Sequence, residues 1–126
     1  MLNAKQINRL AIRCKRKLKG RTDFVSVEEY LNDVGYKVIF FNTNAGDTEL
    51  ARYCLTEKAQ NTNAFTYCGT AKIIFINNNI SPEDKVYSLY HEMGHIMLGH
   101  LECRRIGTTN KILLDIQADA FSCGLL

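Results

Sequence analysis

Hydrophobic residues recur at helical spacing in three stretches of the chain, and short apolar runs lie between them. In residues 3–19 the apolar positions repeat every three or four residues, which predicts an amphipathic helix that ends near Gly20. A second stripe follows Ser81, and a third follows the polar segment 107–110. The three stripes are Ile7, Leu10, Ala11, Cys14 and Leu18; Val86, Leu89, Met93, Ile96 and Met97; and Ile112, Leu113, Ile116, Ala120 and Cys123. We expect each stripe to face the core.

The central part of the sequence predicts strands. Residues 36–41 form one candidate, and residues 64–68 and 72–77 form a hairpin joined at Gly69-Thr70. The near-continuous apolar run 73–76 is typical of an inner strand. The shorter and more polar 64–68 strand is therefore expected at an exposed edge.

Two further helices are predicted between the first stripe and the hairpin. A capping box at Ser26-Val27-Glu28-Glu29 opens a short helix through Asn32, and Gly35 closes it. After a loop at 42–46, Asp47 is expected to cap a helix carrying Leu50, Ala51, Cys54 and Leu55. This order of elements predicts a single α+β domain over residues 1–126, in which a small antiparallel or mixed sheet packs on helices.

Composition narrows the class of protein. The 126 residues are 46% hydrophobic, which is sufficient for one core. No apolar run approaches the ~20 residues of a membrane span, and the N-terminus lacks the apolar core of a signal peptide, so we expect a cytoplasmic protein. Five scattered cysteines without a Cys-x-x-Cys pair predict reduced, mostly buried thiols. A thiol ligand from Cys103 is a disfavoured alternative.

Charge is unevenly distributed along the chain. Residues 1–22 hold eight of the 16 Lys and Arg residues and no acid, which leaves the remaining 104 residues with a formal net charge of −5. A solvated basic face on the first helix is the favoured interpretation. Contact with nucleic acid or an acidic partner is the less favoured one, because no aromatic residue is interleaved with these charges.

The candidate chemistry lies in the second stripe. Residues 91–95 read His-Glu-Met-Gly-His, and on a helix the two histidines project from one face and can reach a single zinc ion. Ser81 as N-cap and Pro82 at the first helical position predict that helix. Glu92 is the general base that a zinc hydrolase needs toward water.

Catalytic zinc usually takes three protein ligands, so a third must come from elsewhere. His100 lies about half a turn round the helix from His91 and just after the helix breaker Gly99, so it cannot share the metal without a sharp reversal of the chain. We interpret it as a polar residue at a helix C-terminus. Asp115 and Asp119 lie one turn apart on the third predicted helix. One of them can bind the metal while the other accepts the outer N–H of a liganding histidine.

These motifs resemble the ImmA/IrrE metallopeptidases. The resemblance covers about residues 34–126 and rests on strand 72–77, the Ser81-Pro82-Glu83 helix start, residues 91–100 and the segment Ala118-Asp119-Ala120-Phe121-Ser122. It implies a cytoplasmic, gluzincin-like zinc endopeptidase of bacteria or phage. The family's glutamate ligand falls at Asp115, so the implied metal ligands are His91, His95 and Asp115, with Asp119 behind them.

The resemblance also implies a substrate. Members of this family cleave helix-turn-helix transcriptional repressors and so release the genes that those repressors silence. The alternatives are a metal-binding regulator that binds a partner repressor without cutting it, and a nucleic-acid-binding protein that uses the basic 1–22 helix. For a peptidase, we expect an extended substrate to pair with the 64–68 edge, and Tyr67, Tyr87 or an arginine to stabilise the oxyanion.

Overall fold

The structure is a computed structural model that describes residues 3–100 and 111–125. Cys103, and with it the alternative of a thiol ligand, lies outside these residues, as does the loop at 107–110. The elements in chain order are α1 Ala4–Lys17, α2 Phe24–Val34, β1 Lys37–Phe41, α3 Asn44–Arg52, α4 Thr56–Ala59, β2 Ala64–Cys68, β3 Lys72–Asn77, α5 Pro82–Met97 and α7 Lys111–Leu125. The α+β class is confirmed.

The sheet is mixed and has the strand order β1-β3-β2. β1 runs parallel to β3, whereas β2 pairs with it antiparallel through the predicted hairpin. Residues 73–76 of the central strand β3 are all buried, because helices cover both faces of the sheet. β2 lies at an edge, as its shorter and more polar sequence predicted.

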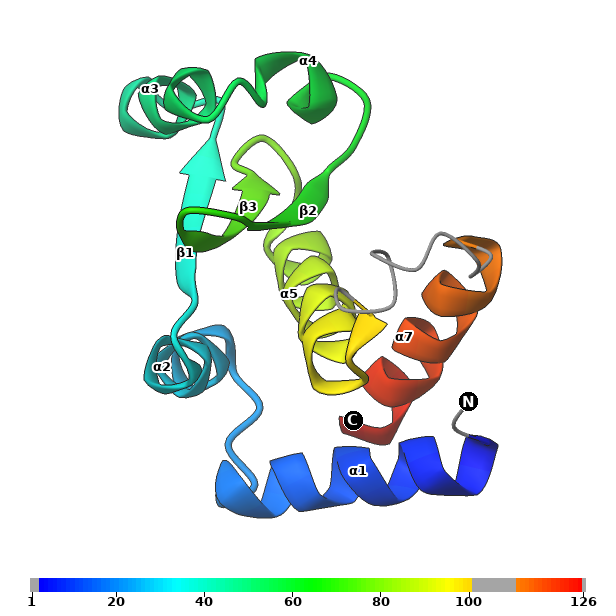
Figure 1. Cartoon of the computed structure of the whole chain (residues 1–126). Helices are drawn as coiled ribbons and strands as arrows, with labels where there is room; N and C mark the ends of the chain where they lie inside the picture. The colour runs from blue at the N-terminus through cyan, green and yellow to red at the C-terminus, as the bar shows by residue number, and fades with distance from the viewer. Residues whose placement is uncertain (1–2, 101–110, 126) are drawn as a thin grey trace.

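The two faces of β3 belong to different hydrophobic clusters. Ile74 and Ile76 pack with α1, α2, α5 and α7, whereas Ile73 and Phe75 pack with residues of α3, α4 and β2. Figure 1 shows α3 and α4 on one side of the sheet and α5 running away from the other side, with α7 beside α5 and α1 across the base. The sheet therefore separates a small α3–α4 layer from the larger helical layer that carries the histidines.

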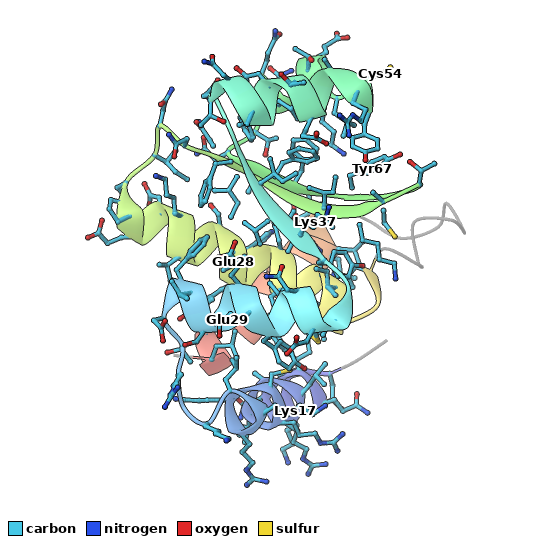
Figure 2. All side chains as sticks on the ribbon, turned by 90° about the vertical axis from the view of Figure 1, so that its left-hand side faces the viewer. Lys17, Glu28, Glu29, Lys37, Cys54 and Tyr67 are labelled. Atoms are coloured by element: carbon cyan, nitrogen blue, oxygen red, sulfur yellow. The ribbon has the colours of Figure 1, made fainter. Side chains whose placement is uncertain are left out.

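The first helix follows its predicted pattern. Ile7, Ala11 and Cys14 are buried at three- and four-residue intervals, and α1 packs extensively on α7. The helix ends before Lys19 and Gly20, which both have positive φ. In Figure 2, which views α1 nearly end-on, Lys17 lies below the α2 helix that carries Glu28 and Glu29.

Two predicted helix starts were wrong. Ser26 does not open α2; Asp23 is the N-cap, and its carboxylate accepts hydrogen bonds from the Ser26 N–H and hydroxyl at 3.1 and 2.7 Å. Asp47 does not open α3 either, because Thr43 caps that helix and accepts from the Gly46 N–H at 3.0 Å. Each segment contains two residues able to cap a helix, and the outer one is used in both cases.

The apolar face predicted for the last helix was also wrong. Ile112 and Ile116 are 69% and 59% exposed, and Ala120 and Cys123 are exposed as well. The buried face of α7 consists instead of Leu114, Ala118, Phe121 and Leu125. Both sets have helical spacing, so periodicity alone did not identify the face that docks on α5 and α1.

The structure also describes the cysteines and the apolar character of the helices. The described cysteines are free, as predicted, but only Cys14 is buried, whereas Cys54, Cys68 and Cys123 are exposed. Within residues 3–100 and 111–125, no helix combines the length and the apolar character needed to span a bilayer.

Candidate metal centre

The helix α5 brings His91 and His95 together. Ser81 caps it by accepting from the Asp84 N–H at 3.1 Å, and Pro82 occupies the first turn, as the sequence predicted. Leu89 and Met93 are fully buried and fix one face of α5 against the core. The histidines project from the neighbouring face, with their Nε2 atoms 3.1 Å apart.

Asp115 of α7 meets both imidazoles. Its Oδ1 lies 3.1 Å from Nε2 of His95 and 3.4 Å from Nε2 of His91. Gly94 makes this approach possible, because a Cβ atom there would lie 2.9 Å from the Ala118 carbonyl oxygen and 3.0 Å from its Cα. The close packing of α7 on α5 therefore lets the short aspartate side chain reach the two histidines.

His91 is oriented from the solvent side. Its Nδ1 lies 2.7 Å from Oδ1 of Asp119, which also accepts the Tyr87 hydroxyl at 2.6 Å. A carboxylate only accepts hydrogen bonds, so Nδ1 of His91 carries the proton and Nε2 keeps its lone pair. The structure thus places Asp119 behind His91, and Asp115 rather than Asp119 between the two rings.

His95 is oriented from the buried side, and the residue that orients it is His100. His100 is 3% exposed, and its Nδ1 lies 2.9 Å from Nδ1 of His95. Its Nε2 lies 2.8 Å from Oε1 of Gln117, an acceptor. The protons therefore run in one direction, from Nδ1 of His95 to His100 and from Nε2 of His100 to Gln117, which leaves a lone pair on Nε2 of His95.

His100 is consequently not simply a polar residue at a helix C-terminus. Gly99, with φ +73°, reverses the backbone after α5 and returns the ring toward His95. The cluster of all three histidines of the chain within ten residues was the sequence signal for this role. Gln117 gave no such signal, because only the docking of α7 on α5 brings it to His100.

The donor set fits a zinc-type ion. Two imidazole lone pairs and a carboxylate oxygen converge within 3.1–3.4 Å, and none of these three atoms offers a proton to the others. A cation between these atoms would offset their mutual repulsion. A tetrahedral ion with bonds of ~2.0–2.1 Å places its ligand atoms about 3.3–3.4 Å apart, which agrees with these separations.

Glu92 lies beside the same site and, like Asp115, lines the cleft there. Ligand-type atoms of His91, Glu92 and His95 all lie within 4.8 Å of one another. The Glu92 carboxylate is buried and accepts the Thr66 hydroxyl at 2.9 Å through Oε1. Thr66 pairs with Ile74 on the α5 side of the sheet, which explains its reach. The position of Thr66 in an alternating strand pattern did not reveal its contact with Glu92 in the sequence.

A cleft of about 380 Å³ opens at the site, with β2 residues on one wall and α5 on the other. Tyr87 lines it, and the hydrogen bond to Asp119 raises the pKa of this phenol to about 12. Partial burial raises the Asp119 pKa, but the hydrogen bonds from Tyr87 and His91 outweigh it and lower that pKa overall. Tyr67 lies at the hairpin turn instead, where its hydroxyl accepts from the Thr70 N–H.

These features define an α+β protein with a His-Glu-x-x-His motif that could hold a metal ion and that meets Asp115 of a following helix. Residues 31–126 match the family model of the IrrE N-terminal-like domain, peptidase M78, and the chain belongs to this family. The family resemblance drawn from the motifs is confirmed. No curated protein and no solved structure matches the chain.

Proposed function

We propose that this protein is a zinc-dependent endopeptidase whose metal ligands are His91, His95 and Asp115. The observation that carries this proposal is the convergence of three acceptor atoms within 3.1–3.4 Å, with Glu92 beside them. Family membership supports a metallopeptidase of the IrrE kind.

Zinc bound by these residues would polarise a peptide carbonyl and lower the pKa of water at the site. Glu92 accepts a proton from the attacking water and returns it to the amine that leaves, so it ends each cycle ionised. Thr66 holds the carboxylate in place through the 2.9 Å hydrogen bond. Asp119 and the His100–Gln117 pair keep both imidazoles in the tautomer that directs Nε2 at the metal.

The edge strand β2 supports binding of an extended polypeptide. Asn77 N–H donates to the Asn63 carbonyl and Gly69 N–H donates to the Ala71 carbonyl. The backbone N–H and C=O groups of the odd-numbered residues of β2 therefore point toward β3. The backbone groups of Thr66 and Cys68 then point to the open edge, where a peptide can add as a further strand, whereas those of Ala64 bond with the Thr62 hydroxyl.

The proposed natural substrate is a DNA-binding repressor, whose cleavage would derepress its target genes. Family membership is the support for this substrate class. Incubation of the zinc-loaded protein with a candidate helix-turn-helix repressor should give discrete fragments by mass spectrometry. An intact repressor after prolonged incubation with protein that cleaves other polypeptides would exclude that substrate.

The test of the enzymatic proposal separates the base from the ligands. Glu92→Gln should keep zinc and lower turnover by a factor of about 10²–10⁴, because it removes a base without removing a ligand. His91→Ala and His95→Ala should lose zinc as well as activity. Full zinc occupancy in both alanine variants, or undiminished cleavage by Glu92→Gln, would contradict the proposal.

The Thr66→Pro variant tests the edge strand, but Thr66 also holds Glu92, so it needs a partner variant. Thr66→Val removes the hydroxyl and keeps the backbone N–H. A higher KM in Thr66→Pro than in Thr66→Val, at equal zinc content, would identify the backbone contribution. Equal KM values would exclude pairing of the substrate at Thr66.

A further inference from the structure

A second hollow, of about 670 Å³, adjoins the metal cleft and has no part in the chemistry described above. It lies among the C-terminal end of β1, α3, α4 and the segment before β2. Asn61, Thr62 and Asn63 line both hollows. A polypeptide bound along the metal cleft can therefore continue past these residues into the second hollow.

The second hollow combines an apolar floor with an amide rim. Phe41, Leu50 and Ala59 are nearly buried and contribute the floor. Asn42, Asn77 and Asn63 form a hydrogen-bonded chain along the rim, with Asn42 to Asn77 at 2.7 Å and Asn77 to Asn63 at 3.2 Å. A side chain that has methylenes and a neutral polar end matches such a lining.

A main-chain donor sets the direction of this amide chain. The Asn79 N–H donates to Oδ1 of Asn77 at 2.9 Å, which fixes the Asn77 amide with its Nδ2 toward Asn63. Asn63 accepts through Oδ1, so its Nδ2 is directed elsewhere as a donor. At the other end, Asn42 donates through Nδ2 to Asn77 and has its own backbone N–H held by Asp47 at 2.8 Å.

Asn63, which carries this donor, also lines the metal cleft. The charge around the second hollow limits which side chains can bind there. Asp47 is the only charged residue among those that line the second hollow. A substrate carboxylate in the hollow would meet this acid, and the cation Lys58 lines only the adjoining metal cleft. A lysine or arginine has no acceptor for Nδ2 of Asn63. A carboxamide offers an acceptor oxygen on a short methylene stem and adds no charge.

We propose that this hollow is a specificity subsite that binds the substrate polypeptide beyond the metal cleft and selects an asparagine or glutamine side chain through Nδ2 of Asn63. The proposal rests on the peptidase function proposed above. It assigns the segment from α4 to β2 a role in choosing the substrate, separate from the residues that hold the metal and the base.

The test selects random peptides from a display library on the zinc-loaded Glu92→Gln protein, which should bind peptides without cutting them. The selected peptides should share Asn or Gln at one position. Asn63→Asp keeps an acceptor for Asn77 but replaces the free donor with an anionic oxygen, so selection on the Glu92→Gln, Asn63→Asp protein should favour Lys or Arg there. A synthetic peptide with the first consensus should bind the second protein about tenfold more weakly, as expected for one lost hydrogen bond.

Asn79→Asp is the matched control. It adds the same charge nearby, keeps the main-chain N–H that orients Asn77, and changes a residue that lines neither hollow. It should leave the consensus unchanged. Asn63→Ala removes the same donor without adding charge and should weaken binding of the synthetic peptide to a similar extent, which provides a second test if Asn63→Asp does not fold.

An unchanged consensus in Asn63→Asp together with unchanged binding in Asn63→Ala would overturn the proposal, as would the absence of any enriched peptide. The wild-type protein separates this outcome from failure of the peptidase function. Selected peptides that bind but are never cut would contradict peptidase activity while supporting the subsite. Peptides that are cut with the same preference in wild type and Asn63→Asp would contradict the subsite alone.

Discussion

The two histidines of α5 are held in different ways on the two sides of the metal site. His91 faces the solvent side, where its anchor is the charged Asp119, whose side chain is 49% exposed. His95 faces the interior, where its anchor is the neutral pair His100 and Gln117, which are 3% and 8% exposed. His91 is therefore oriented by a carboxylate, and His95 by two buried neutral side chains.

This difference follows from the cost of desolvation. A carboxylate behind His95 would have to be buried without water, which costs several kcal/mol unless it is fully paired. A neutral imidazole and an amide orient the same tautomer without that cost, provided that each polar atom has a partner. Among the described residues, no buried side-chain polar atom lacks a hydrogen bond. The exposed side can use a carboxylate because water still solvates it.

The largest expected difference between the two sides is in metal affinity. His100→Leu removes the acceptor for Nδ1 of His95 at a buried position, so the zinc Kd should rise about 100-fold. Asp119→Asn retains an acceptor for His91 and should raise it only about tenfold. Competition with a chelator measures both values. A larger effect for Asp119→Asn would reverse the comparison.

The second difference is in stability without metal. Gln117→Leu leaves the buried Nε2–H of His100 without its acceptor and should lower the free energy of unfolding of the apo-protein by about 1–3 kcal/mol. Asp119→Asn changes a partly exposed interaction and should lower it by less than about 1 kcal/mol. Urea unfolding in the presence of a chelator compares the two. Equal losses would show that burial does not distinguish the two anchors.

The smallest expected effect is a change in the pKa of Tyr87, on the exposed side of the site. The Tyr87 pKa of about 12 should move back toward 10 in Asp119→Asn, because the hydrogen bond to the carboxylate raises it. A raised folded-state pKa stabilises the fold below about pH 10, and this contribution is lost as the pH rises through 12. The lowered Asp119 pKa has the opposite sign, so its contribution is lost as the pH falls through the folded-state value. Spectroscopic titration of the variant, compared with Tyr87→Phe, measures the phenol.

The sequence by itself determined the elements whose signals are local. Ser81, Pro82 and the spacing of His91 and His95 specified the metal-binding helix, because caps and helical periodicity act within a few residues. The hairpin bounds and the edge position of β2 also followed from the sequence, since the apolar run of β3 requires cover on both faces.

Only the tertiary structure decided which face of α7 is buried. That helix carries apolar residues on two sides, and docking on α5 at Gly94 and on α1 buried Ala118 and Phe121 while it left Ile112 and Ile116 exposed. The same docking brings Gln117 to His100 and Asp115 between the two imidazoles. The contacts of Asp115 and Gln117 with the histidines join residues 17–24 positions apart, and the docking on α1 joins the two ends of the chain, so no pattern within one helix could specify them.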